Sequence, residues 1–442
     1  MGRRYQAYPE YKGSGVEWLD DLPSHWEVKR LGSFFEERRN KVSDKDYSAL
    51  SVTMQGIVPQ LENAAKTDAG DNRKLVLKND FVINSRSDRK GSSGISPLDG
   101  SVSLISIVMI PKNINPRFVH HILRSYPFQQ EFYRYGKGIV ADLWSTNSSE
   151  MKNILLPSIP TFEQIQIANF LDHETRKIGT LIEKQQQLIQ LLKEKRQAVI
   201  SHAVTKGLNP DAPMKDTGVE WLGEVPRHWV ISRIKNVVNK IVDGPHFSPK
   251  YLDKGYMFIS ARNIKTDCWS LADAKYISED DFNEFNKRVR PEIGDVLLTK
   301  GGTTGVARTV DLDFPFQVWV HVAVLKTDQT KMDPFYFAYV LNGTTCYEQS
   351  QLYTFGATNN DLGLSRIAKI FFARPPMDEQ RIIHFWLDHE CKKFDNLISK
   401  GNESIELMQE RRTALISAAV TGKIDVRNWH PPQQNNHKET AA

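Results

Sequence analysis

The chain has 442 residues, which is too many for one hydrophobic core and predicts about two to four packing units. Apolar residues make up 40% and charged residues 25%, so the composition excludes global disorder, and the net charge of +5 fits an anionic partner such as nucleic acid without identifying one. Three scattered cysteines, Cys268, Cys346 and Cys391, form no CxxC pair and predict neither a disulfide framework nor a zinc site.

Residues 1–160 predict a first domain of mixed α+β structure. Short apolar runs bounded by turn residues are typical of strands, and here they read FVINS, SLISIVMIP and ILLPSIP, starting at residues 81, 103 and 154. Near the start of the chain, residues 15–26 read GVEWLDDLPSHW, a motif that returns later.

Residues 161–207 predict the first of two long helices. No proline interrupts residues 161–206, and Thr161 with Gln164 suits a capping box at the start. A continuous helix of this length would span roughly 65 to 70 Å at ~1.5 Å per residue. Positions with the 4,3 spacing of a coiled-coil seam are Ile178, Ile182, Gln185, Ile189, Leu192, Arg196, Val199 and Ala203.

Residues 208–217 are rich in proline, glycine and aspartate and predict a hinge before a second domain. The first motif returns as GVEWLGEVPRHW at residues 218–229, an offset of 218 − 15 = 203 residues that chance cannot plausibly produce. The strand-like runs YMFISA, DVLLTKGG and VWVHVAVLK follow. We therefore expect residues 218–376 to form a second α+β domain similar to the first.

Residues 377–424 predict the second long helix, because the start of the first helix is repeated. PTFEQIQIANFLDHE from Pro160 returns as PMDEQRIIHFWLDHE from Pro376, an offset of 376 − 160 = 216 residues. After the helix we expect residues 425–442 to form a disordered tail, whose polar, proline-led part begins at Pro431. The same offset places a second seam at Phe394, Ile398, Gly401, Ile405, Met408, Arg412, Leu415 and Ala419.

These seams predict an antiparallel helix pair. In a parallel pair of equal register Arg196 would face Arg412, and two partly buried like charges repel. An antiparallel pair places Arg196 opposite Gly401 and Gln185 opposite Arg412, although both arginine stems could instead leave the seam for solvent. The remaining predicted pairs are Ile178–Ala419, Ile182–Leu415, Ile189–Met408, Leu192–Ile405, Val199–Ile398 and Ala203–Phe394.

The expected fold is therefore α+β, with two similar α+β domains separated by two long antiparallel coiled-coil helices and an internal pseudo-two-fold repeat. Domains joined to equivalent ends of such a pair would be inverted. On duplex DNA, inverted domains about one helical turn apart would read half-sites centred ~10 bp from each other and leave the spacer unread.

Over essentially the whole chain, these motifs resemble the specificity subunits of type I restriction-modification systems. The resemblance rests on the two GVEW…HW motifs, the hinge TKGLNPDAPMKDTG, the two EQ…LDHE helix starts and the order of the domains. It implies two target-recognition domains that each read one half of a bipartite asymmetric DNA site, and a chain without catalysis of its own.

The resemblance also implies partners. These are two methyltransferase subunits that use S-adenosylmethionine, and restriction subunits that use ATP and Mg, so this chain would itself hold no cofactor and no metal. In one respect the two halves differ, since the first reads SRSDRKGSSG where the second reads LTKGGTTG. We therefore expect the two domains to use different loops and to read different sequences.

Catalytic motifs in the chain are incomplete. Lys300 stands on the wrong side of its glycines for a phosphate loop, so KGGTTG predicts either a strand-connecting turn or a contact of its backbone N–H groups with DNA phosphate. His173-Glu174 lacks the second histidine of a zinc hydrolase, and Asp333-Pro334 predicts a helix start rather than a methyltransferase clamp.

Candidate DNA-reading residues are those with bidentate or charge-assisted hydrogen bonds to bases, in polar or glycine-rich loops. In the first domain these are Gln55, Arg86, Arg89, Lys90, Lys137 and Trp144. In the second they are His246, Lys250, Arg262, Asn263, Lys300, Thr303, Thr304, Asn359 and Asn360. Each of them could equally be a solvated surface residue.

The repeated tryptophans Trp18, Trp26, Trp221 and Trp229 cannot account for different sequences being read. We expect them to pack each domain against the helices, or alternatively to dock a methyltransferase, for which the outward helix faces are the other candidates.

Residues 102–111 are too short and too serine-rich to span a bilayer, so we expect a soluble cytoplasmic protein without membrane contact. A free-standing DNA-binding or regulatory protein, and a coiled-coil scaffold without a nucleic-acid role, remain the alternatives.

Overall fold

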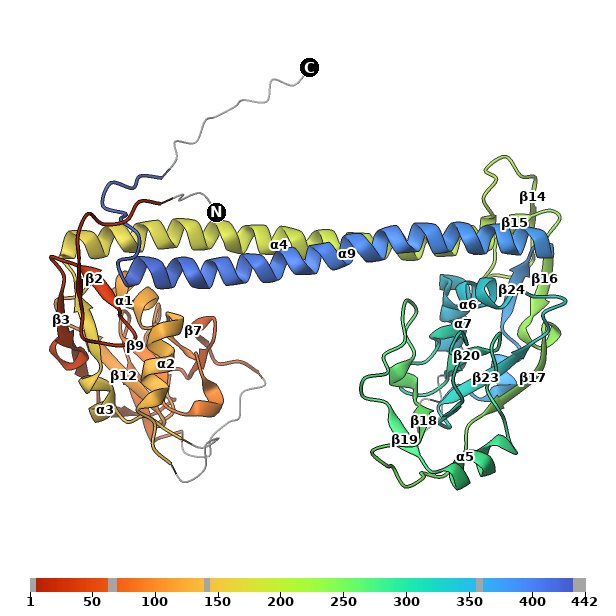
Figure 1. Cartoon of the computed structure of the whole chain (residues 1–442), viewed down its shortest axis with the longest axis horizontal. Coiled ribbons are helices and arrows are strands. Elements are labelled where there is room, and N and C mark those ends of the chain that lie inside the picture. The colour runs from red at the N-terminus through yellow and green to blue at the C-terminus, as the bar shows by residue number, and fades with distance from the viewer. Residues whose placement is uncertain (1–4, 63–69, 139–143, 355–360, 432–442) are drawn as a thin grey trace, which may run out of the picture. The chain divides into compact units, whose positions relative to one another are not determined.

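The computed structural model describes residues 5–62, 70–138, 144–354 and 361–431. The chain divides into two compact units (Figure 1): unit 1 comprises the described residues within 1–184 and 404–442, and unit 2 those within 185–403. Each unit contains a globular α+β part and a portion of both long helices, which confirms the α+β fold class. The expected division gave each helix a segment of its own, whereas both helices contribute to both units.

Unit 1 is built on short strands with helices packed beside them. Its described strands are β1 (Tyr11–Gly13), β2 (Asp21–Pro23), β3 (Glu27–Arg30), β4 (Phe35–Glu37), β5 (Lys41–Val42), β6 (Leu50–Thr53), β7 (Gly56–Pro59), β8 (Arg73–Val76), β9 (Phe81–Asn84), β10 (Ser93–Ile95), β11 (Gly100–Val102), β12 (Ser106–Pro111) and β13 (Leu155–Ser158). Its helices are α1 (Pro116–Ile122), α2 (Tyr126–Arg134) and α3 (Ser148–Asn153), with short 3-10 turns η1 (Leu31–Ser33) and η2 (Ser87–Arg89).

The central sheet of unit 1 has the antiparallel order β10-β9-β12-β4, and β11-β8-β5 form a second sheet. Strand β9 is buried along its whole length, and its Phe81 and Ile83 pack in one core with the phenylalanines of α1 and α2, namely Phe118, Phe128 and Phe132. Helix α1 begins where the sequence predicts. The Asn115 side chain accepts hydrogen bonds from the backbone N–H groups of the first turn, and Pro116 has no backbone N–H that needs an acceptor.

Unit 2 repeats this plan. Its described strands are β14 (Met214–Asp216), β15 (Glu224–Pro226), β16 (Val230–Arg233), β17 (Val238–Asp243), β18 (Tyr256–Ile259), β19 (Lys275–Ile277), β20 (Val296–Thr299), β21 (Ala307–Thr309), β22 (Phe316–Val318), β23 (Val322–Thr327) and β24 (Phe371–Arg374). Its helices are α5 (Glu279–Asn286), α6 (Pro334–Asn342), α7 (Thr344–Thr354) and α8 (Leu364–Ile367), with 3-10 turns η4 (Ile234–Asn236) and η5 (Ala261–Asn263).

The order β21-β20-β23-β17 of unit 2 matches β10-β9-β12-β4 of unit 1, and β14-β15 and β16-β24 match β1-β2 and β3-β13. The smaller sheet differs, since β18 pairs in parallel with β22. The expected single strand VWVHVAVLK is two strands, β22 and β23, with residues 319–321 forming the turn between them.

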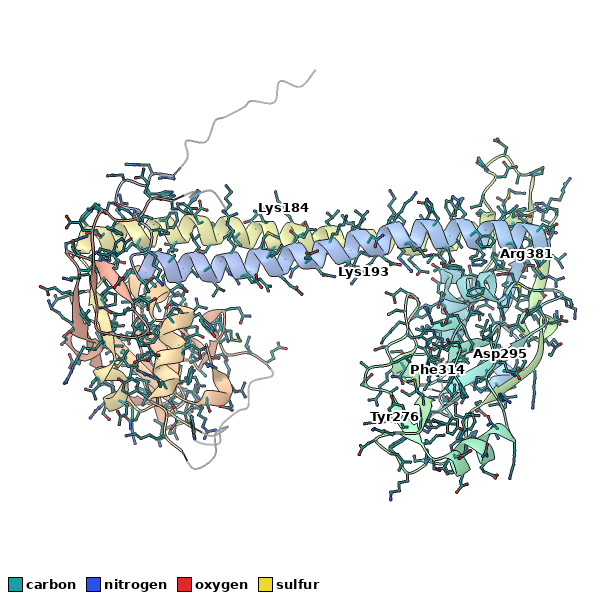
Figure 2. All side chains as sticks on the ribbon, viewed as in Figure 1. Lys184, Lys193, Tyr276, Asp295, Phe314 and Arg381 are labelled. Carbon is teal, nitrogen blue, oxygen red and sulfur yellow. The ribbon has the colours of Figure 1, made fainter. Side chains whose placement is uncertain are left out.

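The two long helices are α4 (Thr161–Lys206) and α9 (Met377–Val420). All sixteen residues of the two expected seams are buried or half-buried, as their spacing predicts. Lys184 and Lys193, which lie outside the seam, are exposed and project from α4 (Figure 2). In unit 2 the helices run antiparallel, because residues 185–196 of α4 meet residues 401–395 of α9 in reverse order.

The expected register of this pair is wrong by one heptad. The sequence placed Met408 opposite Ile189, but a Cβ added to Gly401 would lie 2.9 Å from Ile189 Cγ1, a shift of 408 − 401 = 7 residues. Arg196 meets Asp395 rather than Gly401, with Nε donating to Oδ1 at 2.9 Å. A heptad shift preserves every seam position, so the 4,3 spacing cannot distinguish the two registers.

The expected disordered tail is also partly wrong. Residues 425–431 pack on unit 1: Val426 is buried, Asp425 N–H donates to Gln6 O, and the Trp429 ring lies 5.4 Å from that of Phe170. The equivalent of Phe170 in α9 is Trp386, which is 39% exposed. Residues 432–442 lie outside the described residues.

Candidate nucleic-acid interface

The second tryptophan of each repeated motif joins its globular part to a long helix. In unit 1, Trp26 Nε1 donates to Glu163 Oε2 at the start of α4 at 3.0 Å. In unit 2, Trp229 Nε1 donates to Glu379 Oε1 at the start of α9 at 3.1 Å. The histidine before each tryptophan binds the other carboxylate oxygen. This pairing explains why both motifs and both helix starts are repeated in the sequence.

The helix that ends beside each tryptophan does so at a glycine in the left-handed region. Gly422 follows α9 with φ +73°, and an added Cβ would lie 3.0 Å from the Trp26 ring. Gly207 follows α4 with φ +74°, and a Cβ added there would lie 3.3 Å from the Trp229 ring. The expected packing of Trp26 and Trp229 against the helices is therefore confirmed, whereas Trp221 is 39% exposed.

The glutamine after each helix-start glutamate holds the neighbouring helix α1 or α6. Gln164 Oε1 accepts from Asn115 N–H at 2.8 Å, and Gln380 Oε1 accepts from Asp333 N–H at 2.9 Å. Asp333 in turn caps α6, which confirms the helix start expected there. The repeated residues are thus structural, and the differences between the units lie elsewhere.

Both units carry a cleft at the same place in the repeated fold. In unit 1 it lies between the end of β6, the turn after β9 and Ile105, which precedes β12. In unit 2 it lies between the end of β18, the turn after β20 and His321, which precedes β23. The equivalence extends to the backbone, since Ser85 N–H donates to Ile105 O and Lys300 N–H donates to His321 O.

The cleft of unit 1, with a volume of about 650 Å³, brings together four of the residues expected to read DNA: Gln55, Arg86, Arg89 and Lys90. All four are exposed. Lys90 Nζ donates to Gln130 Oε1 at 2.9 Å, which orients this ammonium on the surface of α2. The result is a basic, amide-bearing groove.

The two other candidates of unit 1 lie next to the same turn. Trp144 is exposed, and its carbonyl accepts from Ser87 N–H at 2.9 Å. The next residue, Ser145, bridges both to Arg86 and to Lys137. Lys137 is exposed and pairs with Glu150 at 2.6 Å. The six residues chosen from the sequence therefore gather on one surface of unit 1.

The cleft of unit 2, with a volume of about 440 Å³, has a different lining. Arg262 is the only expected DNA-reading residue among those described around it. The others are Tyr251, Phe258, Ser260, Ala261, Lys275, Gly301, Gly302, Trp319 and His321. The turn after β20 supplies two glycines here, where the turn after β9 supplies arginine and lysine.

Three candidates of unit 2 are buried, and the side chains of two of them, Lys300 and Asn263, bind other groups inside the protein. Lys300 is 3% exposed and its Nζ lies 2.7 Å from Asp361 Oδ2 and 3.5 Å from Asp243 Oδ2. Asn263 is 1% exposed and binds Ser260 and the Ser270 carbonyl. Thr304 is buried as well. In this structure none of the three reaches the surface, which corrects the expectation for them.

The ion pairs of Lys300 with Asp243 and Asp361 hold the start of the KGGTTG segment. Burial opposes ionisation of Asp243, but Arg288 and Lys300 outweigh it and lower the pKa of this carboxyl. Gly305 N–H donates to Thr299 O at 2.8 Å, so the segment is a strand-connecting turn, one of the two alternatives left open by the sequence. The second alternative, phosphate binding by its N–H groups, is untested.

The remaining candidates of unit 2 are His246, Lys250, Thr303, Asn359 and Asn360. The first three are exposed, and His246 lies 3.3 Å from Asp243. Asn359 and Asn360 lie outside the described residues.

Sequence reasoning missed Tyr251, Trp319 and His321 as cleft residues. All but Tyr251 lie in the run VWVHVAVLK, which predicts a strand, and a large apolar residue in a strand is ordinarily core. No local signal distinguished them, because the alternation of a strand does not apply to residues 319–321, which form a turn.

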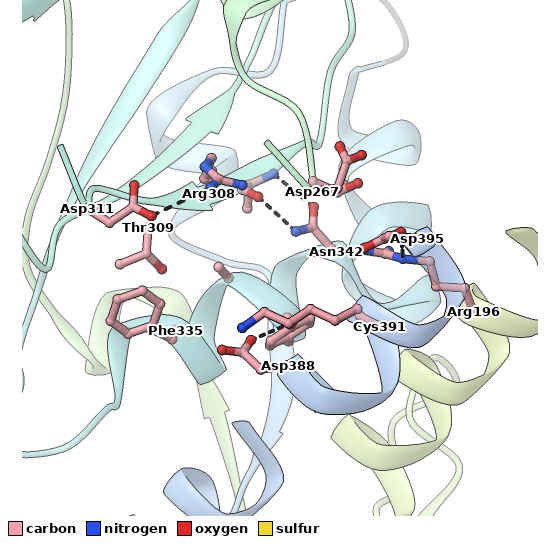
Figure 3. A pocket seen from close by; sticks show the side chains of 15 residues that line it. Arg196, Asp267, Arg308, Thr309, Asp311, Phe335, Asn342, Asp388, Cys391 and Asp395 are labelled. Carbon is pink, nitrogen blue, oxygen red and sulfur yellow. Dashed lines mark hydrogen bonds and ion pairs between the residues drawn. The ribbon is translucent and has the colours of Figure 1, made fainter. Parts of the chain in front are cut away.

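A second cavity of unit 2, of about 260 Å³, lies between its globular part and the long helices (Figure 3). Its charged groups pair with one another, as in Arg196–Asp395 and Arg308–Asp311, and Tyr339 donates to Asp388 at 2.7 Å. Burial raises the pKa of the Cys391 thiol, so it is not an activated nucleophile.

Among the residues that the structure describes, no group of three or more His, Cys, Asp or Glu side chains could hold a metal ion. None of the described helices has the length and apolar character needed to cross a membrane.

Residues 226–407 match the family model described as Type I restriction modification DNA specificity domain. The chain is 22% identical over 418 residues to the Type I restriction enzyme MjaVIII specificity subunit of Methanocaldococcus jannaschii, covering 92% of this chain and 95% of the relative. It is also 22% identical over 218 residues to the Type I restriction enzyme EcoKI specificity subunit of Escherichia coli, covering 47% of this chain and 46% of the relative.

One solved structure, which concerns complex assembly and conformational transition of the type I R-M system, contains a chain of similar fold. The TM-score is 0.68 at 17% identity, over 91% of this chain and 99% of that one. These matches confirm the resemblance of the chain to the specificity subunits of type I restriction enzymes, and residues 226–407 carry a type I restriction modification DNA specificity domain.

Proposed function

We propose that this chain is the DNA-reading subunit of a type I restriction-modification complex, in which each unit reads one half of a bipartite asymmetric site. The observation that carries the proposal is the pair of equivalent clefts, built on the same scaffold but lined by different side chains. A shared scaffold with divergent loops is what two different half-sites require, because loops carry recognition while rigid elements position them.

The cleft of unit 1 has the chemistry for reading purine edges in the major groove. Arg86 and Arg89 can donate bidentate hydrogen bonds to guanine, and Gln55 can pair with adenine. Lys90 and Lys137 carry charge for the phosphate backbone, which supplies salt-dependent affinity without sequence information.

Unit 2 presents fewer charges at its cleft but offers Arg262 and Lys275 there, with His246, Lys250 and Thr303 exposed elsewhere. We assign the DNA contacts of unit 2 to this exposed set. The buried Lys300, Asn263 and Thr304 shape the loops that hold the set in place.

The long helices set the distance between the half-sites and dock two methyltransferase subunits. Two leucines are exposed at equivalent positions of both helices, Leu181 with Leu397 and Leu191 with Leu407, each pair separated by the repeat offset of 216 residues. Equivalent apolar positions suit two copies of one partner. Methylation with S-adenosylmethionine, and ATP- and Mg-dependent cleavage by restriction subunits, then belong to the partners.

The test is to co-express the chain with its methyltransferase partner and to map methylated adenines in the DNA of the cells. We expect a bipartite motif with an unread gap. Adenine methylation without such a motif would overturn the proposal.

A free-standing DNA-binding protein would instead bind DNA without co-purifying with a methyltransferase. Replacing Leu181 and Leu397 by glutamate should abolish co-purification while leaving salt-dependent DNA binding by the isolated chain unchanged.

A further inference from the structure

The cleft of unit 2 is walled by aromatic rings, whereas the described residues that line the cleft of unit 1 include none. Phe258 is almost fully buried and forms the floor, Tyr251 is 43% exposed and Trp319 is half-buried. Aromatic side chains left open to water in a concave site beside polar groups are characteristic of ligand pockets rather than of ordinary surface.

The rings leave room and contact area for a planar guest. The Tyr251 and Phe258 rings are 6.3 Å apart and inclined by 43°, and the Trp319 ring meets His321 edge-on at 77°. Neither pair is stacked face to face, and the Tyr251 and Trp319 side chains both remain partly exposed. The volume of about 440 Å³ lies within the ~300 to 1,000 Å³ typical of small-molecule sites.

The glycine side of the cleft is closely packed against His321. A Cβ at Gly301 would lie 2.2 Å from His321 Nδ1, so a larger residue there would displace the histidine. Gly302 has φ +77°, a conformation that favours glycine. The ion pair between buried Lys300 and half-buried Asp361, at 2.7 Å, holds the start of this turn.

Two exposed cations, Arg262 and Lys275, also line the cleft. Aromatic rings flanked by cations form the usual arrangement for unstacked nucleotides, in which the rings stack on the base and the cations bind the backbone.

We propose that the cleft of unit 2 takes up one nucleobase of the bound DNA, stacked against Trp319 and Tyr251, with Arg262 and Lys275 on the adjoining phosphates. The inference rests on the proposed function and adds a recognition mode for each unit. Unit 1 reads base edges by hydrogen bonds, while unit 2 selects a base by its shape and by stacking.

The experiment uses the full chain in complex with its methyltransferase partner and duplexes carrying its own site. A single abasic residue is placed in turn at each position of the half-site read by unit 2, and Kd is measured at fixed salt. We expect Trp319→Ala to weaken binding about 5- to 150-fold, the range for loss of one base–aromatic stack. At one position the abasic residue should weaken wild-type binding similarly but cause no further loss in the variant.

Two control variants separate stacking from damage to the fold. Trp319→Phe keeps a ring and should retain most of the affinity and the coupling to the same abasic position. Phe314→Ala removes an exposed ring of unit 2 that does not line the cleft, and should bind like wild type.

If the losses of binding free energy caused by Trp319→Ala and by the abasic residue were additive at every position, the proposed nucleobase pocket would be wrong. Site-specific binding by the wild-type complex would still support the proposed function. If the wild-type complex bound no specific site, the proposed function itself would fail.

Discussion

At the scale of single residues, Glu163 and Glu379 are the same residue of the repeat in two environments. Glu163 is buried and accepts from Tyr8, His25 and Trp26. Glu379 is partly exposed and, among the described residues, accepts from His228 and Trp229 alone. When a buried acceptor is removed, its donors lose their hydrogen-bond partner. Each donor that cannot reach water then lowers the free energy of unfolding by about 1–3 kcal/mol.

Glu163→Ala should therefore destabilise the protein by several kcal/mol, and Glu379→Ala by clearly less. Denaturant unfolding of the two variants alongside wild type measures the difference. Equal losses would show that the third donor, Tyr8, contributes nothing.

Asp172 gives a residue-scale prediction for pH. Burial disfavours its charge, but hydrogen bonds from His121 and Arg117 outweigh burial and lower the pKa from 3.8 to about 2. Because the folded-state pKa is depressed, the stabilisation is present above the unfolded pKa and disappears as the pH falls from 3.8 toward 2. The shift corresponds to about 2 kcal/mol at most.

Asp172→Asn should thus lower the free energy of unfolding most above about pH 5, with the gap to wild type closing as the solution becomes more acidic. Urea unfolding across this pH range provides the readout. Asp46→Asn, at an exposed carboxylate, serves as the control and should show no such trend.

At the scale of elements, the two helix glycines Gly179 and Gly401 stand at sites with opposite packing. An added Cβ at Gly179 meets nothing within 4 Å, whereas at Gly401 it would lie 2.9 Å from Ile189 Cγ1 and 3.0 Å from Gln185 Nε2. Alanine in a helix interior is favoured over glycine by about 1 kcal/mol when there is space.

Gly179→Ala should accordingly stabilise the protein by up to about 1 kcal/mol, while Gly401→Ala should gain less or destabilise it, because Ile189 and Gln185 must move. Thermal unfolding of both variants tests the register as well. A full gain at Gly401 would mean that Ile189 does not face it.

At the scale of the whole molecule, the proposal assigns the unread gap to the helices and each half-site to one unit. Inserting one heptad in both helices at equivalent positions adds about 10.5 Å, or ~3 bp of duplex, and should lengthen the gap without changing either half-site. Exchanging residues 27–159 for those of a related subunit should change one half-site only. Mapping of methylated adenines reports both results, and an unchanged gap after insertion would contradict the assignment.

The sequence by itself determined the features that recur in its internal repeat. The motifs at Trp26 and Trp229, the helix starts at Glu163 and Glu379, and the burial of the seam follow from local chemistry and from periods of two, 3.5 and 3.6 residues. The surface position of five candidates of unit 1 also followed from sequence, because arginine, lysine and glutamine in a polar loop remain at the surface in almost any packing.

Only the tertiary structure decided the rest. Each tryptophan ties the start of one helix to the end of the other, and this connection selects among registers that differ by a heptad and share one seam. In unit 2, Lys300 turned inward because Asp243 and Asp361 converge on it from other segments, and Trp319 turned outward because the chain turns between β22 and β23. The partners of Lys300 come from distant segments and Trp319 lies in a turn, and the apolar and polar pattern of the sequence predicts neither outcome.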